Sequence, residues 1–241
     1  MFHRTAKTLL TISLILATGQ INAQDDSPAG WHGTGEFGFV KTGGNTDTES
    51  LNLGLEFIYE KEKWRYTLNA AAQRSEQDGN TDAQRWTVGA QSDYKFSEKS
   101  YWFGSFRHES DKFAGFDPVS TVAVGYGREL IHDERHFLLG ETGIGYRTEE
   151  DATTGESEEN VIFRGRLDYR WTISANSEIA NLSLVESGSD NTYFQNDTSL
   201  NVAINSRFAV KLAFQYRYNS NPPPGKDDTD TQFTTNLVYN F

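Results

Sequence analysis

Residues 51–59 decide the fold class, and they read Leu51-Asn52-Leu53-Gly54-Leu55-Glu56-Phe57-Ile58-Tyr59. Every second side chain from Leu51 to Tyr59 is apolar, and Asn52, Gly54 and Glu56 alternate with them. Successive side chains of a strand point to opposite faces of its sheet, so this stretch has one apolar and one polar face. A helix would scatter the polar residues around its circumference. The segment therefore predicts a strand with one face in an apolar environment.

The same alternation recurs along the chain. In residues 161–171 the apolar side chains alternate with Arg164, Arg166, Asp168 and Arg170. Period-two patterns of this kind are the main sequence signal of half-buried strands. Together they predict twelve strands: 31–41, 49–60, 63–74, 84–96, 101–109, 119–130, 136–147, 160–172, 178–187, 193–205, 207–218 and 230–241. In the ninth of these the pattern does not fix which face is apolar.

The predicted connections alternate in length. The short ones are 60–63, 97–100, 131–135, 172–177 and 205–206, and the longer, hydrophilic ones are 42–48, 75–83, 110–118, 148–159 and 219–229. Outer-membrane barrels have short periplasmic turns and longer outside loops. The prolines at positions 28, 118, 222, 223 and 224 fall outside the predicted strands, where proline would remove a ladder hydrogen bond.

The N-terminus indicates export. Arg4 and Lys7 precede the apolar run 9–17, and Ala23 is followed by polar residues, as in a secretory signal peptide. The run is shorter than the ~20 residues of a membrane-spanning helix. We expect a signal peptide over 1–23, a short periplasmic lead over 24–30 and a barrel over 31–241. An even number of strands starting in the periplasm places the long loops outside the cell and the C-terminus in the periplasm.

Composition narrows the class of protein. The formal charge of −12 argues against nucleic acid as a partner, and the absence of cysteine excludes disulfides and cysteine metal sites. Only 36% of residues are hydrophobic, yet 13% are aromatic. A water-soluble β-sandwich would also alternate, but its core needs more aliphatic side chains. A membrane barrel with a polar lumen needs few aliphatics and many interfacial aromatics.

Aromatic residues gather at the predicted strand ends, as in the two girdles of membrane barrels. Near the expected periplasmic ends these are Trp31, Tyr59, Trp64, Tyr94, Trp102, Tyr126, Trp171 and Tyr239, and near the outer ends Phe39, Trp86, Tyr146, Tyr218 and Phe233. The last strand ends in phenylalanine, with Leu237, Tyr239 and Phe241 on one face. This is the C-terminal signature by which the barrel assembly machinery recognises its substrates. We therefore predict an all-β, transmembrane antiparallel β-barrel in the outer membrane of a Gram-negative bacterium, in contact with lipid and lipopolysaccharide.

Several segments resemble a known family. They are 41–50 (KTGGNTDTES), 107–116 (RHESDKFAGF), 216–223 (YRYNSNPP) and 228–231 (DTDT). They resemble the YdiY-like family of salt-induced outer-membrane proteins over essentially the whole chain after the signal peptide. The resemblance implies a membrane barrel and brings no established substrate, cofactor or catalytic residue.

Candidate chemistry outside the lumen is sparse. His108 and Ser110 share a face of the fifth strand near its outer end, where a lipid hydrolase would use histidine as general base for a serine nucleophile. The alternative is a polar strand end, and we expect no enzyme. The segment from Glu149 to Glu159 is densely acidic and could hold divalent cations that bridge to lipopolysaccharide, or form a solvated loop. The histidines show no metal-ligand spacing, so no metal or cofactor is expected.

The lumen is the remaining candidate site. The predicted register points eight acidic and ten basic residues inward, so the lumen should be nearly neutral. The strongest lumen-lining candidates are Glu36, Glu56, Arg65, Arg85, Glu141, Arg164, Arg166, Asp168, Arg170, Asp197, Lys211 and Arg217. Twelve strands lie between barrels filled by side chains and open porins.

Two hypotheses for the lumen follow. In the first, the barrel is a narrow diffusion channel for small solutes or ions, which prefers anions if the arginine column of residues 164–170 is only partly neutralised. In the second, acidic residues pair with the whole column, and the barrel is closed and serves envelope integrity or a salt-stress response.

Overall fold

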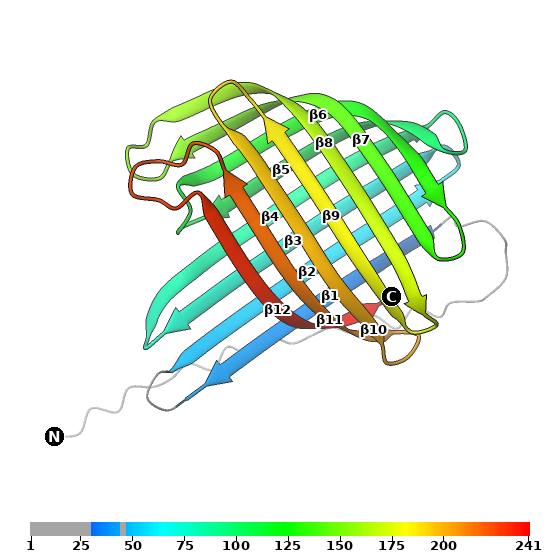
Figure 1. Ribbon diagram of the computed structural model, residues 1–241, viewed down its shortest axis with the longest axis horizontal. Coiled ribbons are helices and arrows are strands. Elements are labelled where there is room, and N and C mark those ends of the chain that lie inside the picture. The colour runs from blue at the N-terminus through cyan, green and yellow to red at the C-terminus, as the bar shows by residue number, and fades with distance from the viewer. Residues whose placement is uncertain (1–29, 44–46) are drawn as a thin grey trace.

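The computed structural model describes residues 30–43 and 47–241. They form a closed antiparallel barrel in which each strand pairs with its sequence neighbours and β1 pairs with β12 (Figure 1). The strands are β1 (Gly30–Thr42), β2 (Thr48–Lys61), β3 (Trp64–Gln77), β4 (Asn80–Lys95), β5 (Ser100–Asp111), β6 (Phe116–His132), β7 (His136–Asp151), β8 (Ser157–Ser174), β9 (Ser177–Ser187), β10 (Thr192–Ala203), β11 (Phe208–Asn219) and β12 (Thr229–Asn240). The prediction of a twelve-stranded barrel is confirmed. The expected signal peptide over 1–23 lies outside the described residues.

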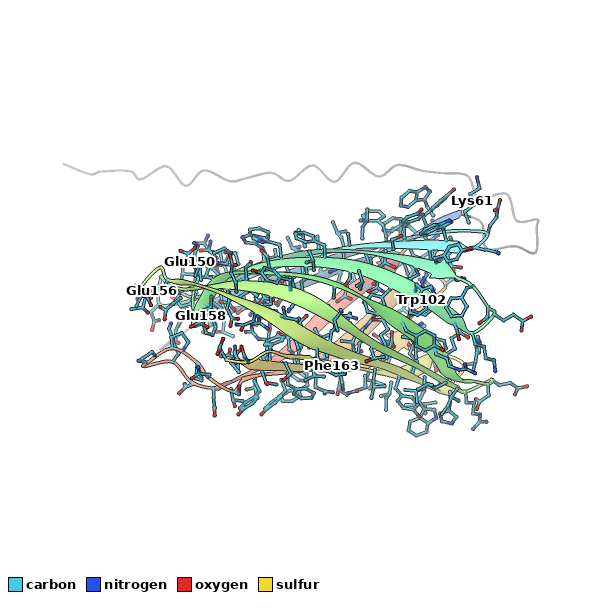
Figure 2. The ribbon with its side chains drawn as sticks, turned by 90° about the horizontal axis from the view of Figure 1, so that it is seen from above. Lys61, Trp102, Glu150, Glu156, Glu158 and Phe163 are labelled. Carbon is cyan, nitrogen blue, oxygen red and sulfur yellow. The ribbon has the colours of Figure 1, made fainter. Side chains whose placement is uncertain are left out.

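The apolar face of the strands forms the outer surface of the barrel. Leu53, Val124 and Phe163 are 42%, 59% and 54% exposed, and Figure 2 shows Phe163 on the outside. A soluble monomer rarely exposes this much apolar surface, whereas the hydrocarbon of a membrane covers it. A membrane also requires that all backbone hydrogen bonds be made within the protein, as they are in a closed barrel. The molecule is therefore a membrane-spanning barrel. Within the described residues, no helix is long and apolar enough to cross a membrane.

The two ends of the barrel differ. We call the end where β1 begins and β12 finishes the terminal end, and the opposite end the loop end. At the terminal end, outward aromatic rings contact one another from strand to strand, with centroid distances of 5.0 Å for Trp31–Tyr59, 5.1 Å for Trp64–Tyr94 and 5.7 Å for Trp102–Tyr126. Figure 2 shows Trp102 and Lys61 toward this end, away from the acidic side chains of the β7–β8 loop.

The barrel closes where β12 meets β1. The registered pairs run from Thr34↔Asn240 to Phe37↔Leu237, and Phe241 exchanges two backbone hydrogen bonds with Gly33, at 2.8 and 2.9 Å. The Phe241 ring packs 5.8 Å from Tyr239 and 5.6 Å from Phe57. Phe241 therefore lengthens the short β1–β12 pairing that closes the barrel.

The strands are longer at the loop end than expected, because polar residues continue the ladder there. The predicted loop 75–83 is wrong: β3 reaches Gln77 and β4 begins at Asn80. The loops 110–118 and 148–159 likewise shrink to residues 112–115 and 152–156. The two-residue turn predicted at 205–206 is wider, since β10 ends at Ala203 and β11 begins at Phe208.

The prediction that every proline lies outside the strands is also wrong, because Pro118 lies inside β6. The register of β6 against β7 shifts between Phe116 and Val119, so the proline occupies an irregular position of the ladder. Proline is tolerated at such positions because no ladder hydrogen bond is lost there.

Candidate functional site

One half of the lumen, inside β5 to β8, is filled by ion-paired side chains; we call it the filled half. Glu141 on β7 is 5% exposed. Its carboxylate accepts hydrogen bonds from the Tyr101 hydroxyl at 2.7 Å and from Arg164 Nη1 at 2.8 Å, and Arg166 Nη1 lies 3.5 Å away. Asp168 lies 3.5 Å from Arg166 and 3.3 Å from Arg170. The predicted arginine column is therefore paired with acids along its length.

Aromatic rings complete the filled half. Tyr101, Phe103, Ala123 and Leu139 form an apolar cluster, and Phe137 packs against it. The guanidinium of Arg164 lies 4.9 Å from the centre of the Phe103 ring. Stacking of this kind holds a cation against an apolar surface. The lumen is thus packed with side chains on this side.

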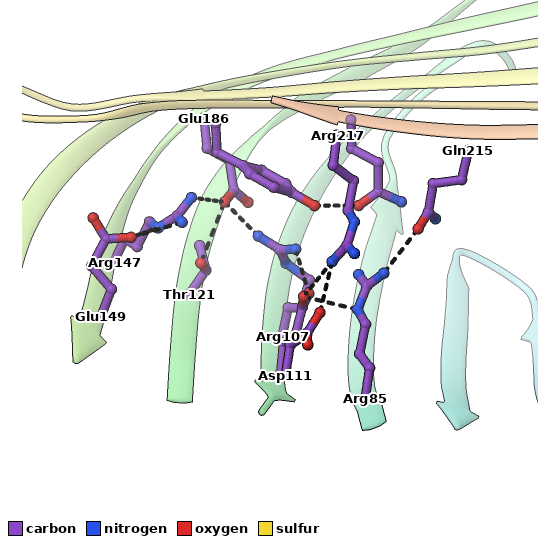
Figure 3. Close-up of polar contacts among 12 residues, drawn as sticks. Arg85, Arg107, Asp111, Thr121, Arg147, Glu149, Glu186, Gln215 and Arg217 are labelled. Carbon is purple, nitrogen blue, oxygen red and sulfur yellow. Dashed lines mark hydrogen bonds and ion pairs between the residues drawn. The ribbon is translucent and has the colours of Figure 1, made fainter. Parts of the chain in front are cut away.

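Toward the loop end, a second network crosses the lumen (Figure 3). We call it the barrier, and its members are Arg85, Arg107, Glu109, Asp111, Arg147, Glu149, Glu186, Tyr193, Gln215 and Arg217. Arg107 Nη2 on β5 lies 2.6 Å from Glu186 Oε2 on β9, and Arg147 Nη1 on β7 lies 3.3 Å from the same oxygen. Both guanidiniums stack 5.1 Å from the centre of the Tyr193 ring.

Contacts of the barrier join strands that are not neighbours. Arg85 on β4 donates to Gln215 Oε1 on β11 at 2.8 Å, and Arg217 on β11 lies 3.1 Å from Asp111 Oδ2 on β5. Glu109 lies between Arg85 at 2.9 Å and Arg217 at 3.5 Å. Because these pairs span the interior from one wall to the other, they obstruct the lumen at this level.

On the terminal side of the barrier lies a cavity of about 890 Å³, which we call the vestibule. A space of only about 30 Å³ lies on the loop side, and Arg107 and Glu109 line both. The open cavity therefore lies on the terminal side and ends at these two barrier residues.

The vestibule is lined by amides and charged groups. Six carboxylates face four cations: Glu36, Glu56, Glu109, Asp168, Glu178 and Asp197 against Arg85, Arg107, Arg170 and Lys211. Lys211 lies 2.8 Å from Glu36, and Asp197 accepts hydrogen bonds from the amides of Gln195 and Gln215, each at 2.6 Å. Within the described part of the chain, Glu56 and Glu178 have no ion-pair partner. The vestibule therefore carries surplus negative charge.

The structure distributes the sequence-predicted lumen residues among these three regions. Glu36, Glu56, Asp168, Arg170, Asp197 and Lys211 line the vestibule. Glu141, Arg164 and Arg166 lie in the filled half, and Arg65 borders it in an ion pair with Asp93 at 2.7 Å. Arg85 and Arg217 belong to the barrier.

The expectation of a nearly neutral lumen missed several acids. Glu109, Asp111, Glu149 and Glu186 are all buried in the barrier. Glu149 shares a face with Arg147, and Glu109 with Arg107, so continued alternation would have found both. Asp111 and Glu149 were assigned to loops because the strands extend further than expected. Glu186 was missed because the pattern of β9 did not show which face points inward.

His108 contacts Ser120 rather than Ser110, the serine that a lipid hydrolase of this kind would use as nucleophile. His108 Nδ1 lies 2.7 Å from Ser120 Oγ on the adjacent strand β6, and the His108 ring lies 5.1 Å from that of Trp86. Among the described residues, no carboxylate or amide contacts His108 to orient it as a base would require. Nor do the described residues hold a group of three potential metal ligands.

The chain is similar to known proteins in sequence and in structure. The chain is 24% identical over 205 residues to the uncharacterized protein YdiY of Escherichia coli strain K12, which covers 85% of this chain and 81% of that protein. Among solved structures, the translocator domain of the autotransporter NalP from Neisseria meningitidis is 11% identical, with a TM-score of 0.49 and coverage of 90% of each chain. The NanC porin is 10% identical, with a TM-score of 0.49 and coverage of 88% of this chain and 98% of its own.

The family comparison covers nearly all of the barrel. The model described as "Protein of unknown function, DUF481" matches residues 35–241. Together with the similarity to YdiY, this match confirms the family resemblance that the sequence segments carried. The chain belongs to the DUF481 family.

Proposed function

We propose that this barrel is a narrow outer-membrane pore for small hydrophilic solutes, with the barrier as its constriction. The observation that carries the proposal is the vestibule of about 890 Å³, which ends at Arg107 and Glu109. A purely structural barrel of this size gains nothing from a hollow, amide-lined half. A solute pathway does, because amides and carboxylates replace the water around a hydrophilic solute.

The constriction is charged, but its charges are satisfied by one another. Glu186 forms ion pairs with Arg107 and Arg147. Glu109 forms ion pairs with Arg85, Arg107 and Arg217. The surplus charge of the pathway lies in the vestibule, at Glu56, Glu178 and Asp197, of which Asp197 is held by amides alone. Rings of unpaired carboxylates favour cations in pores. We therefore propose that the pore prefers cations.

A closed structural barrel is the second candidate. It is favoured by the burial of the barrier, where Arg147, Glu149 and Glu186 are 5%, 2% and 2% exposed. Side chains held this tightly leave little room for a solute without rearrangement. Conduction by the purified protein separates the two candidates.

Planar-bilayer recording with Tyr193→Ala tests the proposal. Removing this ring opens the barrier while its arginines keep their carboxylate partners, so the single-channel conductance should rise above that of wild type. The matched control is Phe194→Ala, which changes the outward neighbour on the same strand and should leave the conductance unchanged. If neither folded wild type nor folded Tyr193→Ala produces single-channel steps, the pore hypothesis fails and the closed barrel stands.

The location and orientation are also proposals. The apolar exterior supports a bacterial outer membrane, where barrels of this kind reside, and short turns at the terminal end support a periplasmic position for that end. The chain has no cysteine, so labelling of a single introduced cysteine reports the accessibility of that position alone. An impermeant thiol reagent should label Thr153→Cys, but not Lys61→Cys, on intact cells. The reverse labelling would contradict this orientation.

A further inference from the structure

Two chains of hydrogen bonds lead from one carboxylate in the vestibule into the barrier. The carboxylate belongs to Asp197 on β10, whose Oδ2 accepts from Gln195 Nε2 and whose Oδ1 accepts from Gln215 Nε2, each at 2.6 Å. Beyond the amides, Gln195 Oε1 accepts from the Tyr193 hydroxyl at 2.6 Å, and Gln215 Oε1 accepts from Arg85 Nη1 at 2.8 Å. Asp197, Gln195 and Gln215, which we call the anchor, therefore connect the vestibule with Tyr193 and Arg85 of the barrier.

The strands place the anchor on one wall of the lumen. Tyr193, Gln195 and Asp197 alternate along β10, so all three share its inward face. Gln215 lies directly opposite Asp197 in the ladder between β10 and β11. Arg85 approaches from β4, on the other wall, and Figure 3 shows its guanidinium directed toward the Gln215 amide. The anchor is thus the support on this wall for one of the contacts that cross the lumen.

Both ends of the anchor meet arginines of the barrier. The centre of the Tyr193 ring lies 5.1 Å from the guanidiniums of Arg107 and Arg147. Arg85 Nε lies 2.9 Å from Glu109 Oε1. The positions of Tyr193 and Arg85 therefore help to decide where three guanidinium groups lie across the lumen.

The chemistry of Asp197 fixes the direction of the bonds in the anchor. An ionised carboxylate only accepts hydrogen bonds, so both glutamines turn their NH2 groups toward it and their carbonyl oxygens toward the barrier. An arginine only donates, so Arg85 needs the Gln215 oxygen in that orientation. The Tyr193 hydroxyl can donate or accept, so it would tolerate a reversed Gln195 amide. Without an acceptor at position 197, neither amide would be held in the orientation that the barrier uses.

We propose that Asp197 holds the barrier closed by fixing the two amides that position Tyr193 and Arg85. It is a positioning residue, because it acts on the constriction through Gln195 and Gln215. Loss of the acceptor frees the Tyr193 hydroxyl and weakens the hold on Arg85, so both side chains can move aside and widen the constriction. The effect on conduction rests on the proposed pore, whereas the coupling between Asp197 and Tyr193 does not.

Planar-bilayer recording of variants at position 197 tests the effect on the pore. Asp197→Leu removes both acceptors and keeps the branched shape of the side chain. It should raise the fraction of time spent open by about tenfold, the effect of losing hydrogen bonds of ordinary strength. Asp197→Asn is the matched control. Its oxygen can accept from Gln215 and its NH2 group can donate to a reversed Gln195, so the open fraction should stay within about twofold of wild type.

Two results would contradict the proposal in a conducting protein. An open fraction of Asp197→Leu equal to that of wild type would show that the barrier does not depend on the anchor. An equal rise in Asp197→Leu and Asp197→Asn would assign the effect to the lost negative charge, because both variants lack the charge and only Asn can keep the hydrogen bonds.

A double-mutant cycle tests the coupling without conduction. Tyr193→Phe removes only the hydroxyl and keeps the stacked ring. In the wild-type background it should shift the urea unfolding equilibrium by about fivefold, but in Asp197→Leu by less than about twofold, because Gln195 is no longer held. Tyr101→Phe in the filled half is the control and should cost the same in both backgrounds. An equal cost of Tyr193→Phe in both backgrounds would overturn the role of Asp197. Coupling in a protein that never conducts would instead retain the anchor and reject the pore.

Discussion

The two halves of the lumen are built from the same strand pattern and reach opposite results. Between β5 and β8, inward aromatic side chains and arginines close the space around Glu141. From β9 through β12 to β3, mainly amides, small residues and carboxylates line the open vestibule. The barrel backbone is continuous through both, so side-chain size and pairing alone decide which half is hollow.

Glycine enables the packing of the filled half. Gly127 lies directly opposite Tyr101 in the ladder, and the Tyr101 ring occupies the space that a Cβ at position 127 would need. Gly125 and Gly143 make similar room beside Phe103. In the vestibule, the side chains that lie over glycines are smaller amides, Asn236 over Gly38 and Asn69 over Gly89. A large ring over a missing side chain therefore fills the lumen, and amides leave it hydrated.

The largest expected effect comes from the centre of the filled half. Glu141→Leu should lower the free energy of unfolding by about 3–5 kcal/mol, because Arg164 would be left buried without its carboxylate. Urea unfolding of the refolded barrel in vesicles measures this. The matched change in the vestibule, Glu56→Gln, should shift the free energy by less than about 0.5 kcal/mol. Similar losses from both variants would show that the two halves do not differ as described.

Substitution of single glycines tests whether the Tyr101 ring requires a glycine at position 127. Gly127→Ala should cost about 1–3 kcal/mol, because the new methyl group overlaps the Tyr101 ring. Gly104 has open space at the corresponding point, so Gly104→Ala should be neutral or stabilising by up to about 1 kcal/mol. The same urea titration measures both. Equal destabilisation would indicate that backbone conformation, rather than the ring, requires glycine at these sites.

Sequence alone predicted the strands well and the site less completely. Alternation located the twelve strands, because most of them turn an apolar face toward lipid, although it did not identify the outward face of β9. It failed at the loop end, where residues such as Glu76 and Glu149 continue the ladder without that demand. It also failed for Pro118, since a local shift of register cannot be read from composition.

The cross-lumen pairs could not be predicted from periodicity. Alternation identifies Arg107 as inward, but its partner Glu186 lies four strands away in the chain order. That pairing depends on how far the strands tilt and stagger as the barrel closes. Strand β9 was ambiguous for a physical reason as well, because its outward face carries the polar residues Asn181 and Ser183 while Leu182 and Leu184 point inward.

The vestibule, rather than the filled half, should set ion preference. The double variant Glu56→Gln with Glu178→Gln should lower the cation-to-anion permeability ratio by roughly fivefold for each charge, because a carboxylate ~8 Å from the path in water stabilises a cation and destabilises an anion by about 0.5 kcal/mol each. Reversal potentials in asymmetric KCl measure this ratio. Glu49→Gln, in an exposed ion pair with Lys41 outside the lumen, is the control and should change little. An unchanged ratio in the double variant would place the selectivity elsewhere.

The smallest expected effect compares two turns at the terminal end. Asp133, in the β6–β7 turn beside the filled half, accepts backbone hydrogen bonds from Arg135 at 2.9 Å and His136 at 2.8 Å. Asn205, in the β10–β11 turn beside the vestibule, accepts the equivalent bonds from Arg207 at 2.9 Å and Phe208 at 3.0 Å. The geometry is shared, but only Asp133 can titrate.

The backbone hydrogen bonds from Arg135 and His136 lower the pKa of Asp133. A carboxylate whose folded pKa is lowered stabilises the fold above its unfolded pKa, and this contribution is lost as pH falls through the folded value. The amide protons of Arg135 and His136 should therefore change their chemical shifts only below about pH 4. Those of Arg207 and Phe208 should not respond, and Asp133→Asn should make the first turn behave like the second. NMR titration of the refolded protein measures this, and an acid response that persists in Asp133→Asn would assign it to another group.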